Sequence, residues 1–152
     1  MSTPYSANHV AGLIIDRCEI NGEYLTAIKL QALLYFVQTQ FILRDNTICI
    51  KDSIYAGPNG PYIKSVQKRL EKVPEGVIPY EELKKLFPYE KRMDPHSMSI
   101  MQSAVDPAAS LGEKELLKTA AAQLPYKKAL ERDSKQIMVR DIRIFFRKPQ
   151  LD

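Results

Sequence analysis

The longest apolar stretch of the chain runs from Ile28 to Leu43 and is interrupted only by scattered polar residues. Its apolar residues are too many for one stripe of a helix, which is typical of the central helix of a domain. We expect a helix from about Ala27 to Arg44, with Thr26 as its N-cap.

Three polar or half-polar residues of that helix, Gln31, Tyr35 and Gln38, are spaced i, i+4, i+7 and share one face. They either lie buried with their hydrogen bonds satisfied or line a groove for a partner. We prefer the first interpretation, because buried polar groups normally find partners inside the fold.

Apolar periodicity and end signals predict further helices on both sides of this one. Ser6 is a candidate N-cap for the first, which Asn21-Gly22 interrupts, and Ser110 with Glu113 forms a candidate capping box. The segment 98–105 fits either a short strand or a helical turn, and 88–95 reads as irregular. The expected helices span about 7–18, 61–72, 80–87, 111–124, 126–132 and 139–147.

Two short segments rich in β-branched and aromatic residues follow the central helix, Thr47–Ile50 and Ser53–Ala56. They predict a small β-hairpin that turns at Lys51-Asp52. The sequence Gly57-Pro58-Asn59-Gly60-Pro61 then predicts a rigid turn, with Pro61 as the first residue of the next helix. The fold class expected is mainly α, a compact helical bundle-like single domain over residues 1–152 with a small β-hairpin element.

Length and composition agree with an ordinary globular chain. The 152 residues are 45% hydrophobic and 26% charged, the net charge is +4, and two cysteines are present. A chain of this length buries enough surface to need no disulfide or metal. No apolar run has the length of a membrane helix and no secretory signal is visible, so we expect a cytoplasmic protein.

Candidate catalytic chemistry is sparse. His9 and His96 belong to no metal-ligand spacing, and no phosphate-binding GxxxxGK or GxGxxG motif is present. A pair of Cys49 with either histidine is not excluded by sequence separation, but nothing supports it. We therefore expect no catalytic residues, no metal and no cofactor, and do not expect an enzyme.

Basic residues are spread over the second half of the chain. The closest approach to a cluster is Arg140, Arg143, Arg147 and Lys148, which forms either a solvated face or a patch for nucleic acid or an acidic partner. Residues 111–132 have a pattern similar to that of a helix-turn-helix. Glu131 and Asp133 lie beside the basic residues of its second helix, which does not favour DNA binding.

The segments Lys29–Phe36 (KLQALLYF) and Ala56–Pro61 (AGPNGP) together resemble the Panacea domain, also called the SocA-like, phage-associated antitoxin family. That family has an N-terminal helix after a Tyr-Ser or similar pair, a capping Thr, a K-L-Q-K-L-L-Y-F helix and a Gly-Pro step. The second half echoes the family more weakly, in Leu111–Leu116, Pro125–Leu130 and Ile137–Phe146. Its Trp after the second-half proline is Tyr126 here, and 72–109 matches no part of the family pattern.

The resemblance implies an antitoxin of a toxin–antitoxin pair, which binds and neutralises a cognate protein toxin by direct contact. Some members act instead as adaptors that deliver the toxin to a protease, and a DNA-binding transcriptional regulator is a third interpretation. Exposed tyrosines and the rigid loop are the expected partner-binding residues, since tyrosine is enriched in interface hot spots. They are Tyr55, Asn59, Gly60, Pro61, Tyr62 and Tyr89.

Overall fold

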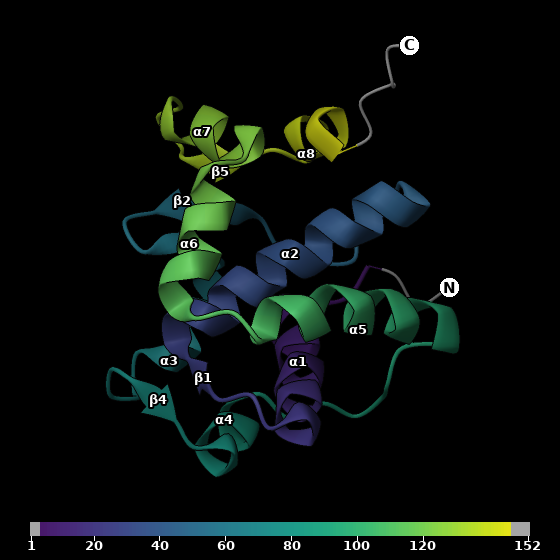
Figure 1. Cartoon of the computed structure of the whole chain (residues 1–152), viewed down its shortest axis with the longest axis vertical. Helices are drawn as coiled ribbons and strands as arrows, with labels where there is room; N and C mark the ends of the chain where they lie inside the picture. Colours follow the sequence, from purple (N-terminus) through teal and green to yellow (C-terminus); the bar gives the residue numbers. More distant parts are fainter. Residues whose placement is uncertain (1–3, 147–152) are drawn as a thin grey trace.

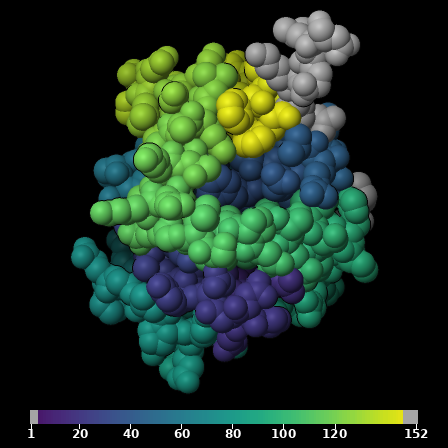
Figure 2. Space-filling view, in the orientation of Figure 1, coloured from purple at the N-terminus to yellow at the C-terminus, as the bar shows by residue number. Residues whose placement is uncertain are grey.

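The computed structural model describes residues 4–146 and shows a mainly helical fold with short strands, as expected (Figure 1). The central helix α2 (Ala27–Asp45) crosses the molecule, and α1 and α5 pack along one side of it. The segment from α6 to α8 covers another side, so that α2 appears in Figure 2 as a strip between α5 and α7–α8. The other elements are α1 (Ala7–Asn21), β1 (Leu25–Thr26), β2 (Ile54–Gly57), β3 (Gly60–Tyr62), α3 (Lys64–Leu70), β4 (Val77–Ile78), α4 (Tyr80–Leu86), α5 (Pro95–Ala109), α6 (Glu113–Ala121), α7 (Leu124–Leu130), β5 (Gln136–Ile137) and α8 (Val139–Phe146).

The predicted caps of the first two helices are confirmed. The Ser6 hydroxyl accepts a hydrogen bond from the N–H of His9 (3.2 Å), and the Thr26 hydroxyl accepts one from the N–H of Lys29 (3.0 Å). Each bond satisfies a backbone donor that a helix start leaves without an intrahelical partner. At the other end, α1 runs to Asn21, three residues beyond the end expected at Cys18, and Gly22 caps it with a φ of 72°.

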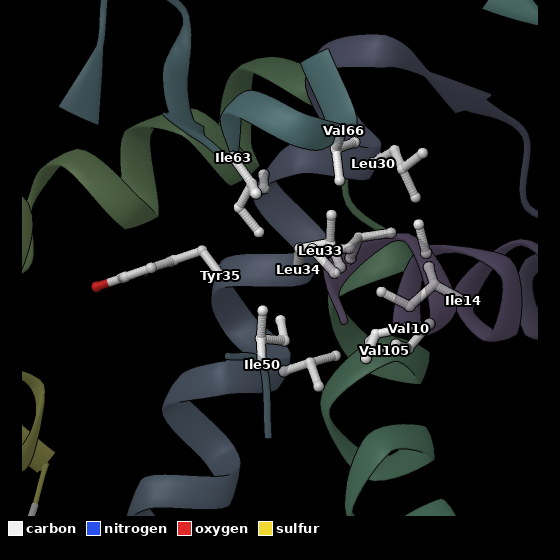
Figure 3. Close-up of a cluster of buried hydrophobic side chains, with 14 of the residues drawn as sticks. Val10, Ile14, Leu30, Leu33, Leu34, Tyr35, Ile50, Ile63, Val66 and Val105 are labelled. Carbon is white, nitrogen blue, oxygen red and sulfur yellow. The ribbon is translucent and has the colours of Figure 1, made fainter. Parts of the chain in front are cut away.

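The core is mainly aliphatic and is built mainly from α1, α2, α3 and α5. Figure 3 shows side chains from these helices converging, together with Ile50 and Ile63, which flank the hairpin. The fully buried members include Val10, Ile14, Leu30, Leu33, Leu34, Val66 and Val105. Burial of each such side chain contributes roughly 1.5–3 kcal/mol, so this cluster supplies much of the driving force for folding.

The three polar or half-polar residues of α2 are buried and make their hydrogen bonds inside the protein, as in the preferred interpretation. Gln31 in addition lines a cleft that is described below, so the two interpretations do not exclude each other for this residue. Gln31 donates to the carbonyl of Ile63 (3.2 Å) and accepts from its N–H (3.0 Å). Gln38 donates to the carbonyl of Ile50 (3.0 Å) and accepts from the N–H groups of Cys49 and Ile50 (both 2.9 Å). The ring of Tyr35 is buried, but its hydroxyl points away from the aliphatic cluster (Figure 3).

The hairpin exists, but its predicted position was wrong. Its strands are β2 and β3, with Tyr55 opposite Tyr62 and Gly57 opposite Gly60, and the turn lies at Pro58-Asn59. In 47–50, where the first strand was predicted, only Ile50 forms a β-bridge, with Tyr5. The backbone of Cys49 and Ile50 binds the Gln38 side chain instead, an interaction that local β-propensity does not reveal.

Lys51-Asp52, the expected hairpin turn, instead connects two helices through the Asp52 side chain. The Asp52 carboxylate accepts hydrogen bonds from the N–H of Ala7 (2.8 Å) and from the hydroxyl of Ser65 (3.0 Å). It therefore ties the start of α1 to the first turn of α3.

Three other helix predictions need correction. Pro61 belongs to β3, so α3 begins only at Lys64. The ambiguous segment 98–105 is part of α5, which continues through Pro107 to Ala109. The capping box at Ser110 is absent: α6 starts at Glu113 after Gly112, and the Glu113 carboxylate accepts a hydrogen bond from the Thr26 hydroxyl.

Two short sheets complete the fold. Strand β2 lies between β3 and β5, so residues near 54 pair with residues near 137, and β1 pairs with β4. Within residues 4–146, no helix is long and apolar enough to cross a membrane.

Candidate functional site

The predicted partner-binding loop is the tip of the β2–β3 hairpin. Pairing of Gly57 with Gly60 leaves Pro58 and Asn59 as a two-residue loop, and both are exposed. Gly60 has a φ of 99°, a conformation that side-chain-bearing residues rarely adopt. The tight turn thus depends on glycine at this position.

Tyr55 and Tyr62 form an aromatic pair on one face of the hairpin. They lie opposite each other in the strand register, with ring centroids 5.7 Å apart and planes inclined by 34°. The ammonium of Lys64 lies 4.3 Å from the centroid of the Tyr55 ring, within the range of a cation–π interaction. Both tyrosines are half-buried, and each retains surface for contact with a partner.

A cleft of about 360 Å³ opens beside this hairpin. Its mostly apolar walls come from three segments that are separated in sequence: the first turns of α2, the hairpin tip and the end of α3. Four of the predicted residues, Asn59, Gly60, Pro61 and Tyr62, line it, and Tyr55 lies next to it through its contact with Tyr62. We call it the hairpin cleft; its lining is Ala27, Ile28, Gln31, Gly57, Pro58, Asn59, Gly60, Pro61, Tyr62, Gln67, Leu70 and Glu71.

The walls of the hairpin cleft are held from several sides. Gln31 fixes the backbone of Ile63 below the tip, and the Tyr126 hydroxyl donates to the carbonyl of Gly57 (2.6 Å). Leu117 of α6 packs so closely on Gly60 that a Cβ there would overlap its side chain. The loop is therefore presented in a fixed position by α2, α6 and α7.

Sequence reasoning missed the wall of the cleft that faces the loop. Gln67, Leu70 and Glu71 come from the end of α3, and Ile28 comes from the start of α2. Positions 67, 70 and 71 are spaced i, i+3, i+4 on a helix directly after the loop, so their common face was readable from the sequence. That this face lies toward the loop depends on tertiary packing.

Tyr89 does not join the loop residues. Its hydroxyl donates to the Asp16 carboxylate on α1, and its ring centroid lies 5.8 Å from that of His9. Burial, together with the hydrogen bond to Asp16, raises the pKa of Tyr89 above its ordinary value. Tyr89 lines a different cleft, at the start of α1.

The candidate basic face is described only in part. Arg140 and Arg143 lie on α8 and are exposed, and the Nε of Arg143 donates to the side-chain oxygen of Asn46 (2.7 Å). Arg147 and Lys148 lie outside the described residues. On the same helix, Asp141 is buried and pairs with Arg132, so it does not reduce the charge of the exposed surface.

The two cysteines are placed unfavourably for nucleophilic attack or metal binding, because both are buried. Burial raises the pKa of the Cys18 thiol to about 12 and also raises the pKa of Cys49, so both thiols are protonated at neutral pH. His96 pairs with Asp45 at the surface (2.9 Å). Among residues 4–146, no group of three or more His, Cys, Asp or Glu side chains is arranged to hold a metal ion.

No protein-family model, no curated protein and no solved structure matches this chain.

Proposed function

We propose that this chain is a binding protein that neutralises a cognate protein toxin through the hairpin cleft, as the antitoxin of a toxin–antitoxin pair. The proposal rests on the resemblance of Lys29–Phe36 and Ala56–Pro61 to the Panacea domain. The observation that carries it is the hairpin cleft itself, an open and mostly apolar hollow lined by the loop that forms one of these two segments.

The cleft has the properties of a protein-binding surface. Protein interfaces combine an apolar, often aromatic centre with a polar rim. Here the half-buried Tyr62 and Ile28 supply apolar surface beside Pro61, which is itself buried, while Gln67 and Glu71 are exposed polar residues at the edge of the cleft. A loop already fixed by hydrogen bonds loses little conformational entropy on association, which favours tight binding. We propose that an apolar side chain of the toxin enters the cleft and that a basic group of the toxin meets Glu71.

Binding, rather than catalysis, is the activity we propose, with no cofactor and no metal, in the cytoplasm. The buried, protonated thiols of Cys18 and Cys49 support this proposal, because a thiolate and not a thiol is the effective nucleophile.

The test is co-expression with the product of the neighbouring gene, with growth and co-purification measured together. We expect growth to be restored and a stable complex to form. If the neighbouring product is harmless and nothing co-purifies, the antitoxin proposal fails.

The structure supplies a matched pair of variants that tests the place of binding. Glu71 and Glu131 are both exposed glutamates at helix C-caps in right-handed helical conformation, but only Glu71 lines the hairpin cleft. We expect Glu71→Arg to weaken toxin binding about tenfold through charge repulsion at the interface, and Glu131→Arg to leave it unchanged. Equal affinities of the two variants, measured by titration calorimetry, would remove the hairpin cleft from the interface.

Two other activities, those of a proteolysis adaptor and of a DNA-binding regulator, predict different results. A proteolysis adaptor lowers the toxin level only when a protease is present. A DNA-binding regulator that uses Arg140 and Arg143 is retained on DNA with a steep dependence on salt. Growth rescue without a complex favours one of these two over direct neutralisation.

A further inference from the structure

The three-stranded sheet has one face that points to the core and one that reaches solvent. Ile54 and Ile137 lie opposite each other on the first face, and both are buried. Tyr55 lies opposite Tyr62 of β3 and also opposite Gln136 of β5. Because directly opposite residues of neighbouring strands share a face, Tyr62, Tyr55 and Gln136 form one row across all three strands. We call it the tyrosine row.

The side chains of the tyrosine row are accessible to a ligand. All three residues are half-buried, and the hairpin that carries both tyrosines lies at the edge of the molecule (Figure 1). Gln136 donates one N–H of its side-chain amide to the Ser53 hydroxyl (3.2 Å). Its amide carbonyl and second N–H form no hydrogen bond within the described residues, so they remain free to bind.

Positive charge lies directly beside the tyrosine row. The ammonium of Lys64 is 4.3 Å from the centroid of the Tyr55 ring, and Lys68 follows one turn later on the same side of α3. Both lysines are exposed, and neither forms an ion pair within residues 4–146. Helix α3 contains no acidic residue before its C-cap, Glu71. Two like charges one turn apart repel each other, so an anion bound beside them relieves this repulsion.

We propose that the tyrosine row binds single-stranded nucleic acid. Such a ligand combines flat bases with a chain of negative charges, and the row combines two aromatic rings with unpaired lysines. Aromatic side chains on a sheet stack unpaired bases with little regard to their sequence. The Gln136 amide meets the polar edge of a stacked base. A duplex keeps its bases paired and stacked on one another, so it does not offer them to the tyrosines.

The present position of Lys64 is compatible with this use of Tyr55. An exposed cation–π contact is weaker than the stacking of a base on an aromatic ring, so a base can displace the ammonium from the ring. The lysine side chain is long and flexible. It can therefore turn from the ring to the phosphate beside the stacked base.

The experiment uses the full chain and fluorescein-labelled oligothymidylate and oligouridylate of about twelve nucleotides, within the range of known single-strand sites. Fluorescence anisotropy measures affinity in a series of salt concentrations. We expect saturable binding that weakens as salt rises. A DNA duplex of the same length should bind at least about tenfold more weakly. A preference for either oligonucleotide supports the proposal, since both offer unpaired bases.

Two exposed tyrosines provide a matched pair of variants. Tyr24, like Tyr55, has a lysine ammonium near its ring (Lys29, 5.6 Å), but it lies outside the three-stranded sheet. We expect Tyr55→Leu to weaken binding about tenfold, Tyr24→Leu to leave it unchanged, and Tyr55→Phe to retain most of it, because a phenyl ring still stacks. Circular dichroism of each variant checks that the fold is intact.

A second pair of variants tests the contribution of charge. Lys64→Gln should reduce the dependence of affinity on salt by roughly one phosphate contact. Lys85→Gln removes the same charge from an exposed position of α4 and should leave that dependence unchanged. The proposal is overturned by absence of saturable binding, by duplex binding as tight as single-strand binding, or by equal weakening in Tyr55→Leu and Tyr24→Leu. No toxin is needed, so the outcome is independent of the antitoxin proposal.

Discussion

At the scale of single residues, the side chains of two glutamines make the backbone hydrogen bonds that a neighbouring strand would otherwise make. Cys49, Ile50 and Ile63 lie in irregular segments whose buried backbone groups have no strand partner in the described chain, apart from the single bridge between Ile50 and Tyr5. Gln31 and Gln38 offer both a donor and an acceptor, so one side chain satisfies a backbone N–H and a backbone carbonyl together. The sequence predicted that these residues are buried and satisfied, but not which backbone they bind.

Removal of the Gln38 amide should therefore destabilise the protein strongly. Gln38→Ala leaves three buried backbone groups of Cys49 and Ile50 without a partner, at about 1–3 kcal/mol for each group. We expect a total loss of at least about 3 kcal/mol in the free energy of unfolding, measured with urea. Gln40→Ala, two residues further along α2, is the control, because Gln40 makes only a long contact to Arg44 (3.5 Å). Similar losses in the two variants would contradict the importance of the Gln38 bonds.

At the scale of elements, the hairpin and α6 are fitted to each other at Gly60. Any side chain at this position meets Leu117, and the φ of 99° is itself unfavourable for residues other than glycine. The sequence indicated a turn that depends on glycine. It gave no sign of the contact with α6, which is more than fifty residues away in the chain.

Substitutions at Gly60 and Gly76 distinguish the cost of the contact with Leu117 from the cost of the positive φ. Both have positive φ, but a Cβ at Gly76 meets nothing within 4 Å. We expect Gly76→Ala to cost about 1–2 kcal/mol from backbone strain alone, and Gly60→Ala to cost more. Urea unfolding of the double variant Gly60→Ala, Leu117→Ala measures the coupling. The extra loss of unfolding free energy in Gly60→Ala, relative to Gly76→Ala, should shrink when Leu117 is shortened. If the losses of Gly60→Ala and Leu117→Ala simply add in the double variant, the contact is unimportant.

The contact between α1 and α5 includes an ion pair whose contribution depends on pH. Arg17 binds Asp106 through two hydrogen bonds (2.9 and 2.7 Å), and Asn21 donates a third (2.8 Å). The hydrogen bond from Arg17 is the main cause that holds the pKa of Asp106 below its ordinary value of 3.8. A lowered carboxyl pKa stabilises the folded state above the unfolded pKa, and this stability is lost as the pH falls through the folded one.

Asp106→Asn should therefore lower stability at neutral pH, by less than about 1 kcal/mol, because more than a third of the Asp106 side chain is exposed. The difference from the parent protein should be smaller at pH 3 than at neutral pH, because part of the contribution is lost once the pH falls below the ordinary carboxyl pKa of 3.8. Urea unfolding at the two pH values checks this. Asp133→Asn, at an exposed carboxyl without an ion pair in the described residues, should show no such difference.

At the scale of the whole molecule, the helices were easier to predict from the sequence than the contacts between elements. The two N-terminal helices followed from caps and periodicity, whereas β2 pairs with β5 across some eighty residues, which no local pattern reveals. Met98, Met101 and Val105 have the helical spacing i, i+3, i+7, but the segment 98–105 alone was too short to separate a helical turn from a strand, and it lies in α5 packed against α2. The loop of the hairpin cleft was predicted from its glycines and prolines. The cleft was not, because it requires three distant segments to be brought together.

The double attachment of the hairpin to α2 has a consequence for how this protein can change over evolutionary time. Gln38 binds the chain just before the hairpin and Gln31 binds it just after, so both ends of residues 51–62 are fastened to one helix. Pro58 and Asn59 at the tip are exposed, so a change of either side chain removes little buried contact. Substitutions at the tip can then accumulate and retune recognition, while the fold that presents them stays unaltered.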